Sequence, residues 1–450
     1  MDRRFFLSGV AGLGLAACVS TPGALVGWPA LTPASDALDL ESAAMEAWIY
    51  GVMLIENAGS RSDFQTRTST PTNVLQHYRE LITVETQDVT TPNNDTLYSR
   101  AWIDLDAGPV TLDMPESGDR YVSYAFMDMY GTNFAILGTR TTGGAARRVT
   151  LIGPKGASND LLAIRSPTRW VWLLIRTLID GEADRPAANA LQDKMKLTAN
   201  AAPPASVYAK RDAAWDQFLG SLQTLLTENP PTVSDLALFA RVARLGLGPT
   251  SGFNPAKFST TEVAQIQSGL AKGRAAVIGK RSGNVRNGWM YPRSNLGAFG
   301  QDYLFRAQVA VGGLAALTLV EATYLRPVFS DGGFLWPSEK PWILRFEKDN
   351  LPPVNAFWSL TAYERAEGGG FYFFNNPIDR YAIGDRTPGL KFGADGSLEI
   401  YIQRNDPGGA RSSNWLPSPP SKPLALSMRL YLPKAQVLDG LYTMPALTPG

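Results

Sequence analysis

The stretch that decides the fold runs from Asn93 to Gly143 and reads NNDTLYSRAWIDLDAGPVTLDMPESGDRYVSYAFMDMYGTNFAILGTRTTG. From Leu97 onward its apolar residues recur at every second position, which is the period of a half-buried β-strand. The same alternation returns in 110–114 and 121–130, and Gly108-Pro109 separates the first two runs as a turn. Short strands with this Gly and Pro punctuation predict a β-sandwich.

The composition around this stretch is that of a globular protein. The chain has 450 residues, which corresponds to about three domains at ordinary domain size. Hydrophobic residues make up 44% and charged residues 18%, so the chain is too apolar to be disordered. The formal net charge is only +1, which gives no electrostatic case for binding nucleic acid.

Helical patterns flank and interrupt the strands. Apolar residues at helical spacing predict a helix over 38–55, a set of helices between 180 and 281, and a further helix over 300–324. Strand patterns resume at about Trp342 and continue to 432. The expected fold class is therefore a multi-domain α+β protein with two β-sandwiches, an N-terminal helix and a central helical insert.

The two strand-rich regions also repeat each other. Residues 121–124, 137–143, 166–167 and 174–176 match 357–360, 383–389, 418–419 and 427–429 in the same order. The spacing between partners rises steadily from 236 to 253 residues, as loop insertions in a second copy would produce. We therefore expect two related sandwiches.

Two long motif sets resemble a known bacterial family. Residues 91–99, 102–105, 120–121 and 136–143 resemble the domain of unknown function 1254. Residues 351–354, 357–361, 380–381, 395–398 and 414–417 resemble its usual partner, the domain of unknown function 1214. The resemblance covers nearly all of the chain after the tether and implies two jelly-roll-like sandwiches in a protein that is often a homo-oligomer. It implies no catalytic residue, because no activity is securely assigned to the family.

The first residues read as an export signal. Arg3-Arg4 precedes a short apolar run, as in twin-arginine signals, and Leu15-Ala16-Ala17-Cys18 resembles a bacterial lipobox. Cys18 is the sole cysteine, so lipidation there would leave a mature chain without a thiol. The alternative is a plain signal peptide with an incidental cysteine. We expect a periplasmic lipoprotein that contacts the membrane through its lipid anchor only, and the absence of an aspartate after Cys18 favours the outer membrane.

These signals divide the chain into five parts. We expect a signal peptide with lipobox over 1–18, a tether over 19–37, and the N-terminal helix with the first sandwich over 38–180. A helical region over 181–325 and the second sandwich over 326–450 complete the chain.

The candidate site lies on the head of the opening stretch. If Tyr98, Arg100, Trp102 and Asp104 share a face with Tyr124, Phe126, Asp128 and Tyr130, that face carries two aspartates, one arginine and five aromatic rings. Aromatic walls with a few convergent polar groups are typical of sites for small or sugar-like molecules. The candidate catalytic residues are then Asp104, Asp128 and Arg100, and the candidate substrate-binding residues are Asn94, Asp95, Tyr98, Trp102, Tyr124 and Tyr130.

Two other interpretations of these residues stay open. In one, Arg100 pairs with Asp104 or Asp128 and the aromatic rings are packing residues. In the other, Asn94, Asp95 and Asp104 supply oxygens to Ca²⁺ or Mg²⁺, although no cofactor is required by any motif. His77 is the only histidine, which excludes a metal site built from three histidines, and it is expected to be a hydrogen-bonding residue rather than a catalyst.

Three functions remain compatible with the sequence. The first is a periplasmic hydrolase or lyase that acts on a small organic or sugar-like molecule. The second is a non-catalytic lipoprotein that binds such a ligand, and the third is a structural component of the cell envelope. The chain shows no phosphate-binding glycine loop, no Gly-x-Ser-x-Gly elbow and no His-Glu-x-x-His motif.

Overall fold

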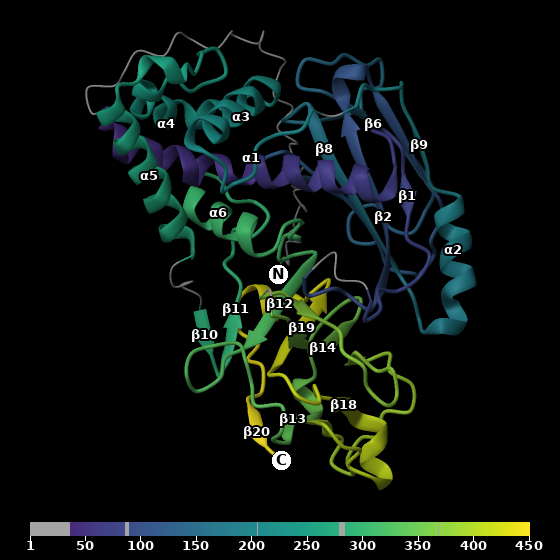
Figure 1. The fold of residues 1–450 in the computed structure, drawn as a ribbon. Coiled ribbons are helices and arrows are strands. Elements are labelled where there is room, and N and C mark those ends of the chain that lie inside the picture. The colour runs from purple at the N-terminus through teal and green to yellow at the C-terminus, as the bar shows by residue number, and fades with distance from the viewer. Residues whose placement is uncertain (1–36, 86–89, 205, 279–283, 368) are drawn as a thin grey trace, which may run out of the picture.

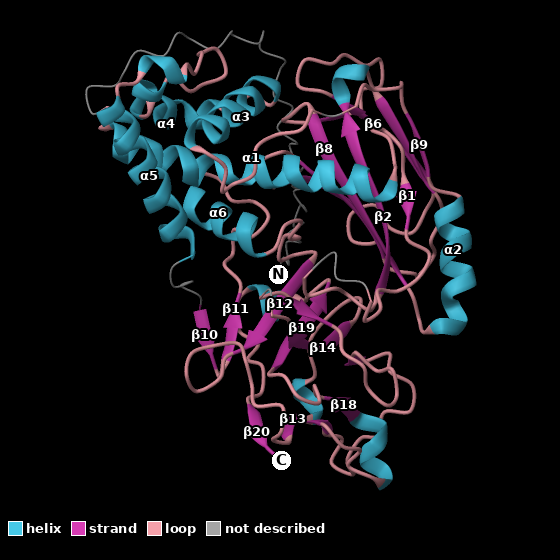
Figure 2. Cartoon of the chain, viewed as in Figure 1, coloured by secondary structure: helices cyan, strands magenta, loops and turns pink. Residues whose placement is uncertain are grey.

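The computed structural model describes residues 37–85, 90–204, 206–278, 284–367 and 369–450. The expected export signal, Cys18 and the tether up to Asp36 lie outside the described residues. The described chain is a mixed α+β protein with an N-terminal helix, four sheets and a central helical stretch (Figures 1 and 2). This arrangement confirms the coarse fold class.

The first strand-rich region forms two sheets. The larger sheet has the order β1 (Gln76–His77), β2 (Thr96–Asp104), β8 (Trp170–Leu178), β4 (Val122–Met127), β5 (Asn133–Gly138). The smaller sheet has the order β7 (Ile164–Arg165), β6 (Arg147–Ile152), β3 (Val110–Met114), β9 (Lys196–Thr198). One buried apolar cluster contains side chains of both sheets, among them Ile103 of β2 and Leu112 of β3. The two sheets therefore share a core.

The second strand-rich region repeats this plan. Its larger sheet has the order β10 (Asn284–Arg286), β11 (Trp289–Tyr291), β12 (Ala322–Pro327), β19 (Leu424–Tyr431), β14 (Trp358–Arg365), β15 (Phe371–Tyr372), with β16 (Ala382–Gly384) also paired to β14. Its smaller sheet has the order β18 (Trp415–Pro417), β17 (Leu398–Gln403), β13 (Trp342–Phe346), β20 (Leu447–Pro449). A second buried cluster again joins the two sheets.

The strand registers confirm the internal repeat. Ser123 of β4 lies opposite Gly138 and Arg176, and Ser359 of β14 lies opposite Gly384 and Arg429. Glycine is needed at both equivalent positions, because a Cβ atom there would lie 2.1 Å from a main-chain oxygen of the neighbouring strand. The matched sequence segments are therefore structurally equivalent positions of two copies.

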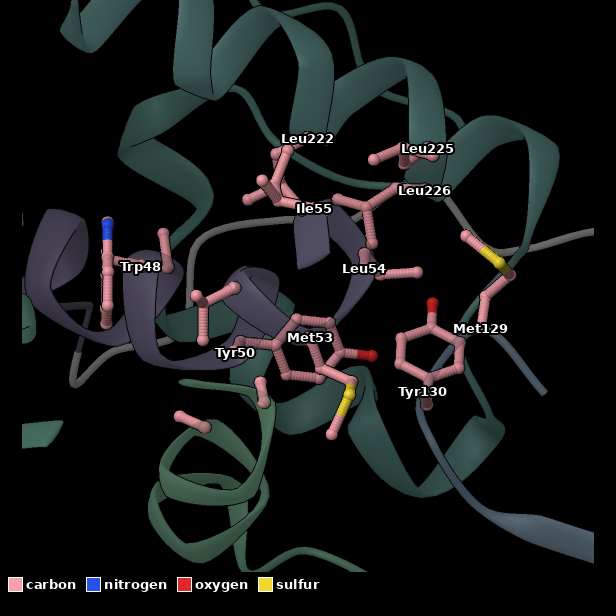
Figure 3. Packing of buried hydrophobic residues seen from close by; sticks show 14 of the residues in the cluster. Trp48, Tyr50, Met53, Leu54, Ile55, Met129, Tyr130, Leu222, Leu225 and Leu226 are labelled. Carbon is pink, nitrogen blue, oxygen red and sulfur yellow. The ribbon is translucent and has the colours of Figure 1, made fainter. Parts of the chain in front are cut away.

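The N-terminal helix α1 (Leu40–Thr68) is the centre of the helical layer. Asp39 caps it by accepting a hydrogen bond from the Ser42 main-chain nitrogen at 2.8 Å. Figure 3 shows side chains of α1, including Tyr50 and Leu54, packed against leucines of α3 and against Tyr130. The same cluster includes Trp172 of β8, so α1 lies over the outer face of the first large sheet, as Figure 1 also shows.

Four helices pack around α1, namely α3 (Trp215–Glu228), α4 (Leu236–Arg241), α5 (Thr260–Ile278) and α6 (Tyr303–Gly312). Two others lie elsewhere, since α2 (Arg185–Asp193) packs on the first two sheets and the short α7 (Ala435–Leu438) packs in the second strand-rich region. Within the described ranges, none of the helices combines the length and the apolar character needed to cross a membrane.

Two element predictions were wrong. The helix expected over 300–324 ends at Gly312, because Gly312-Gly313 stops it, and after a loop the chain continues as strand β12 from Ala322. The region expected to be helical between 180 and 281 also contains a strand, since α2 ends at Asp193 and Lys196–Thr198 pairs with β3 as β9. In both cases an amphipathic pattern continued across a real boundary.

Candidate functional site

A cavity of about 1300 Å³ lies between the helical layer and the outer faces of the two large sheets. Its roof comes from α1, α6 and the loop after α6, and its floor comes from β2 and β8 of the first copy and β12 and β19 of the second. Much of the wall is apolar, and these residues include Ile55, Trp172, Leu174, Leu296, Phe305, Val309 and Leu314.

The floor of this cavity carries arginine and tyrosine. Tyr98 lies opposite Arg176 in the β2–β8 pair, and Tyr324 lies opposite Arg429 in the β12–β19 pair. All four side chains line the cavity, together with Arg100 of β2. Arg100 donates a hydrogen bond from Nη2 to the Tyr78 hydroxyl, and its guanidinium lies 4.6 Å from the Tyr78 ring centre.

The predicted common face is not formed. Across β2, β8 and β4 the register places Arg100 opposite Leu174 and Leu174 opposite Ala125. Ala125 therefore shares the cavity side of the sheet with Arg100, whereas Tyr124 and Phe126 point into the core between the two sheets. The prediction was wrong by one position of register, and a shift of one residue moves every side chain to the other face.

Asp104 is part of a buried ion pair. Its carboxylate accepts two hydrogen bonds from Arg169, from Nε at 2.7 Å and from Nη2 at 2.6 Å, and a third from the Asp106 main-chain nitrogen at 3.1 Å. Asp104 does not line the cavity. The expected partner Arg100 is replaced by Arg169, which no motif had marked.

Asp128 and Tyr130 are also structural. The Asp128 carboxylate accepts hydrogen bonds from the main-chain nitrogens of Tyr130 and Thr132, both at 2.9 Å, and thereby closes a turn. Burial raises the pKa of Asp128 to about 6, although these hydrogen bonds oppose the shift. The Tyr130 hydroxyl donates to the Asn229 carbonyl at 2.8 Å. Neither residue lines the cavity.

The Asn93–Asp95 turn joins the two copies. The Asp95 carboxylate accepts a hydrogen bond from Ser359 Oγ at 2.6 Å and lies 3.6 Å from Arg386. Asn93 donates from Nδ2 to the Tyr431 hydroxyl at 2.6 Å. Asn94 is half-buried in the same turn and does not line the cavity. Of the residues expected to bind substrate, Tyr98 is the one that the structure places in the cavity wall.

The predicted hard-cation site is not assembled either. Asp95 and Asp104 stand at opposite ends of strand β2, roughly 30 Å apart at about 3.3 Å per residue. Trp102, between them, is buried and stacks on Trp172 with ring centres 4.9 Å apart. Among the described residues, no group of three or more His, Cys, Asp and Glu side chains is placed to hold a metal ion.

His77 and Glu56 are two further titratable side chains of the cavity wall. His77 lies 2.7 Å from Ser99 Oγ through Nδ1, and burial lowers the pKa of His77 to about 4, so its imidazole is neutral at pH 7. Glu56 of α1 pairs with Arg211 at 2.9 Å. Burial raises the pKa of Glu56, and Arg211 partly offsets that rise. Glu56 is thus a carboxyl of the cavity wall whose pKa lies above its ordinary value.

Sequence reasoning missed Arg176, Arg429 and Tyr324 as functional candidates. A signal was available, since each arginine interrupts a strand that is otherwise almost wholly apolar, WVWLLIRTL in 170–178 and LALSMRLY in 424–431. The repeat also placed these two arginines at equivalent positions. A charge at one buried position in both copies is a stronger pointer to a site than the density of polar residues.

Comparisons with known proteins match two separate family domains, one to each strand-rich region. Residues 72–199 match the family described as "Protein of unknown function (DUF1254)", and residues 321–435 match "Protein of unknown function (DUF1214)". The chain belongs to the DUF1254 and DUF1214 families. The DUF1254 domain supplies Tyr98 and Arg176, and the DUF1214 domain supplies Tyr324 and Arg429. No curated protein shows significant sequence similarity to the chain.

Two solved structures resemble the chain. The crystal structure of the VPA0106 protein from Vibrio parahaemolyticus is 23% identical, with a TM-score of 0.70 over 91% of this chain and 100% of that one. An uncharacterised protein from Burkholderia cenocepacia is 11% identical, with a TM-score of 0.43 over 91% of this chain and 94% of that one. The first likeness shows that the Vibrio protein shares the fold.

Proposed function

We propose that this chain is an exported lipoprotein of the bacterial envelope that binds a small organic molecule in the cavity between its helices and its two large sheets. The twin-arginine pair and the lipobox around Cys18 support export and lipid anchoring, most simply at the outer membrane. The paired sheets, each with a shared core, support two jelly-roll-like sandwiches as the scaffold.

The observation that carries the binding proposal is the make-up of the cavity wall. Ligand sites in proteins are typically apolar clefts of about 300–1000 Å³ with a few convergent polar groups. This cavity, at about 1300 Å³, has long aliphatic and aromatic walls and a small set of buried arginines and tyrosines on its floor. An apolar molecule with one polar end fits that description better than a sugar, whose hydroxyl groups need many polar partners.

A neutral fluorescent probe tests the proposal. N-phenyl-1-naphthylamine brightens in apolar surroundings, so the purified chain should enhance its emission with saturable binding. Val309→Trp should weaken this binding, because Val309 lines the cavity from α6 and the indole would occupy part of its apolar wall. Leu304→Trp is the matched control, since Leu304 is 42% exposed on the same helix and does not line the cavity. Failure of the wild-type protein to bind the probe saturably would refute the cavity as a binding site.

A hydrolase or lyase is the second candidate, and Glu56 is the observation that favours it. A carboxyl with a raised pKa on a cavity wall is the kind of group that donates a proton in catalysis. Asp104 and Asp128 no longer serve this hypothesis, because both are engaged in structural hydrogen bonds away from the cavity. Incubated with a metabolite library, the wild-type protein should form a product that Glu56→Gln does not form. Recovery of every bound ligand unchanged would contradict catalysis and support binding as the function.

A further inference from the structure

Two buried arginines occupy equivalent positions of the two copies. Arg176 is 6% exposed and Arg429 is 4% exposed, yet both line the cavity. Within the described part of the chain, neither guanidinium has a carboxylate within ion-pair distance. A buried charge without a counter-charge is costly, and proteins retain such groups mainly where something else supplies the opposite charge.

The hydrogen bonds of Arg176 leave part of its guanidinium unused. Its Nη2 reaches the Ala315 carbonyl at 3.5 Å, which is the limit of a hydrogen bond, and its buried Nη1 has no partner in the described chain. The guanidinium also lies 5.6 Å from the ring centre of Tyr98. Burial lowers the pKa of Arg176 and the neighbouring Tyr324 and Tyr98 raise it, and an arginine pKa is high enough that the guanidinium is protonated at neutral pH in either case. Arg176 therefore stays charged and presents a free donor.

Arg429 is held more firmly in the second copy. Its Nη1 donates to Thr361 Oγ1 at 2.7 Å, and its Nη2 donates to the Thr91 carbonyl at 2.9 Å. These partners are neutral, so they fix the direction of the guanidinium without pairing its charge. The Asp95 carboxylate is the nearby negative group, and it helps to raise the pKa of Arg429 without forming an ion pair with it.

The carbonyl partners of both arginines sit on strained backbone. Thr91 has φ 51° and Ala315 has φ 60°, in the left-handed region that non-glycine residues avoid. Such conformations cost free energy, most of all for β-branched threonine, and they concentrate at functional sites. Here each one turns a carbonyl toward an arginine of the cavity floor.

Apolar side chains also line the cavity. Leu296, Phe305, Val309 and Leu314 line it from the helical roof, and Trp172 and Leu174 line it from strand β8. A ligand that satisfies both parts needs one acidic head group and a hydrocarbon or aromatic body.

We propose that Arg176 and Arg429, with the Tyr98 and Tyr324 hydroxyls beside them, form a subsite for the oxyanion head of an amphiphilic organic acid. This inference rests on the proposed binding function and names its ligand class. The head is a carboxylate, a sulfate or a phosphate, because a guanidinium donates paired hydrogen bonds to any of the three.

Competition with matched ligands tests the subsite. Decanoate, decyl sulfate, decyl phosphate and neutral decanol are each titrated against bound N-phenyl-1-naphthylamine on the full wild-type protein. At least one of the anions should displace the probe at a concentration roughly tenfold to hundredfold below that of decanol, the range expected for charge-assisted hydrogen bonds in a buried site. The best anion identifies the head group.

Variants separate the subsite from the rest of the cavity. Arg176→Met should lower the anion-to-decanol ratio by about tenfold, because one of the two guanidiniums is lost and Arg429 remains. Arg293→Met should keep the wild-type ratio, because Arg293 also lines the cavity but is already paired with Asp302. If Arg176→Met does not fold, the ratio measured on wild type still decides the question.

Each outcome has one meaning. Probe binding with no preference for any anion over decanol would overturn the oxyanion subsite and leave the binding cavity standing. Failure of the wild-type protein to bind the neutral probe would overturn both, and it would be seen before any competitor is added. An anion preference that Arg176→Met retains in full would overturn the role assigned to Arg176.

Discussion

The replacement Asp104→Asn separates a structural role of Asp104 from a catalytic one. Asp104 is completely buried, and its two oxygens accept charge-assisted hydrogen bonds from Arg169. Breaking a buried ion pair by removing one charge typically costs about 3–5 kcal/mol. Arg169 is 24% exposed, so water can solvate part of its charge after the replacement. We therefore expect Asp104→Asn to lower the free energy of unfolding by about 3 kcal/mol.

Urea unfolding followed by tryptophan fluorescence measures this loss. With a slope of about 3 kcal/mol per molar urea, the transition midpoint should fall by roughly 1 M. Asp106→Asn is the matched control, because Asp106 contacts the same arginine at 3.4 Å but is 72% exposed. An exposed pair contributes at most about 1 kcal/mol, so that variant should unfold close to wild type.

The stability of Asp104→Asn decides between a structural and a catalytic role of Asp104. A large loss of stability with unchanged binding of the neutral probe would confirm that Asp104 fixes the end of strand β2. A midpoint within experimental error of wild type, combined with loss of turnover or ligand binding, would refute the structural role and return Asp104 to the chemistry.

Three further replacements test other parts of the fold, each by urea unfolding. Burial raises the pKa of Asp128 to about 6, so ionisation of this carboxyl lowers the free energy of unfolding as pH rises from about 4 to 6. Asp128→Asn should remove this dependence of stability on pH and stabilise the protein by up to about 3 kcal/mol at pH 7. An unchanged pH dependence would contradict the raised pKa of Asp128. Gly138→Ala should destabilise by about 3 kcal/mol because its Cβ would meet a main-chain oxygen at 2.1 Å. Gly143→Ala, with φ 69° and open space around the new Cβ, should cost only about 1 kcal/mol. Gly269→Ala should destabilise by about 2 kcal/mol or more, because the new Cβ on α5 would lie 2.1 Å from a main-chain oxygen of α1 and would force the two helices apart. Stability equal to that of wild type would show that the helices can separate at this point without loss of stability.

Much of the sheet structure was predictable because it follows from strong local patterns. The run predicted over 110–114 coincides with β3, and the strand patterns expected to resume at about Trp342 begin where β13 begins, since each is a short alternating run bounded by turn residues. The helices expected between 180 and 281 are also present, among them α5. It failed after Gly312, where an apolar pattern continued without a change of period although the chain changed from helix to strand.

The site was less predictable than the fold, for a physical reason. Period-two reasoning gives the two faces of each strand but not the register between strands that are far apart in sequence. Tyr98 and Tyr124 therefore looked like neighbours, although the register placed them on opposite faces. The cavity itself arises only when α1 and α6 cover the outer faces of both sheets, and no local pattern encodes that contact.

The floor and the roof of the cavity come from different parts of the chain. Its floor, with Arg176 and Arg429, lies inside the two family-matched regions 72–199 and 321–435, whereas its roof helices α1 and α6 lie outside both. The head group and the body of a ligand are thus contacted by separate parts of the chain. A chimera that takes α6 from the Vibrio protein should therefore keep the preference for anions and change the preferred length of the hydrocarbon body. Both preferences are measured by titration with alkanoates of six to fourteen carbons. If the chimera loses the anion preference as well as the length preference, roof and floor do not act separately, and the position of the arginines depends on α6.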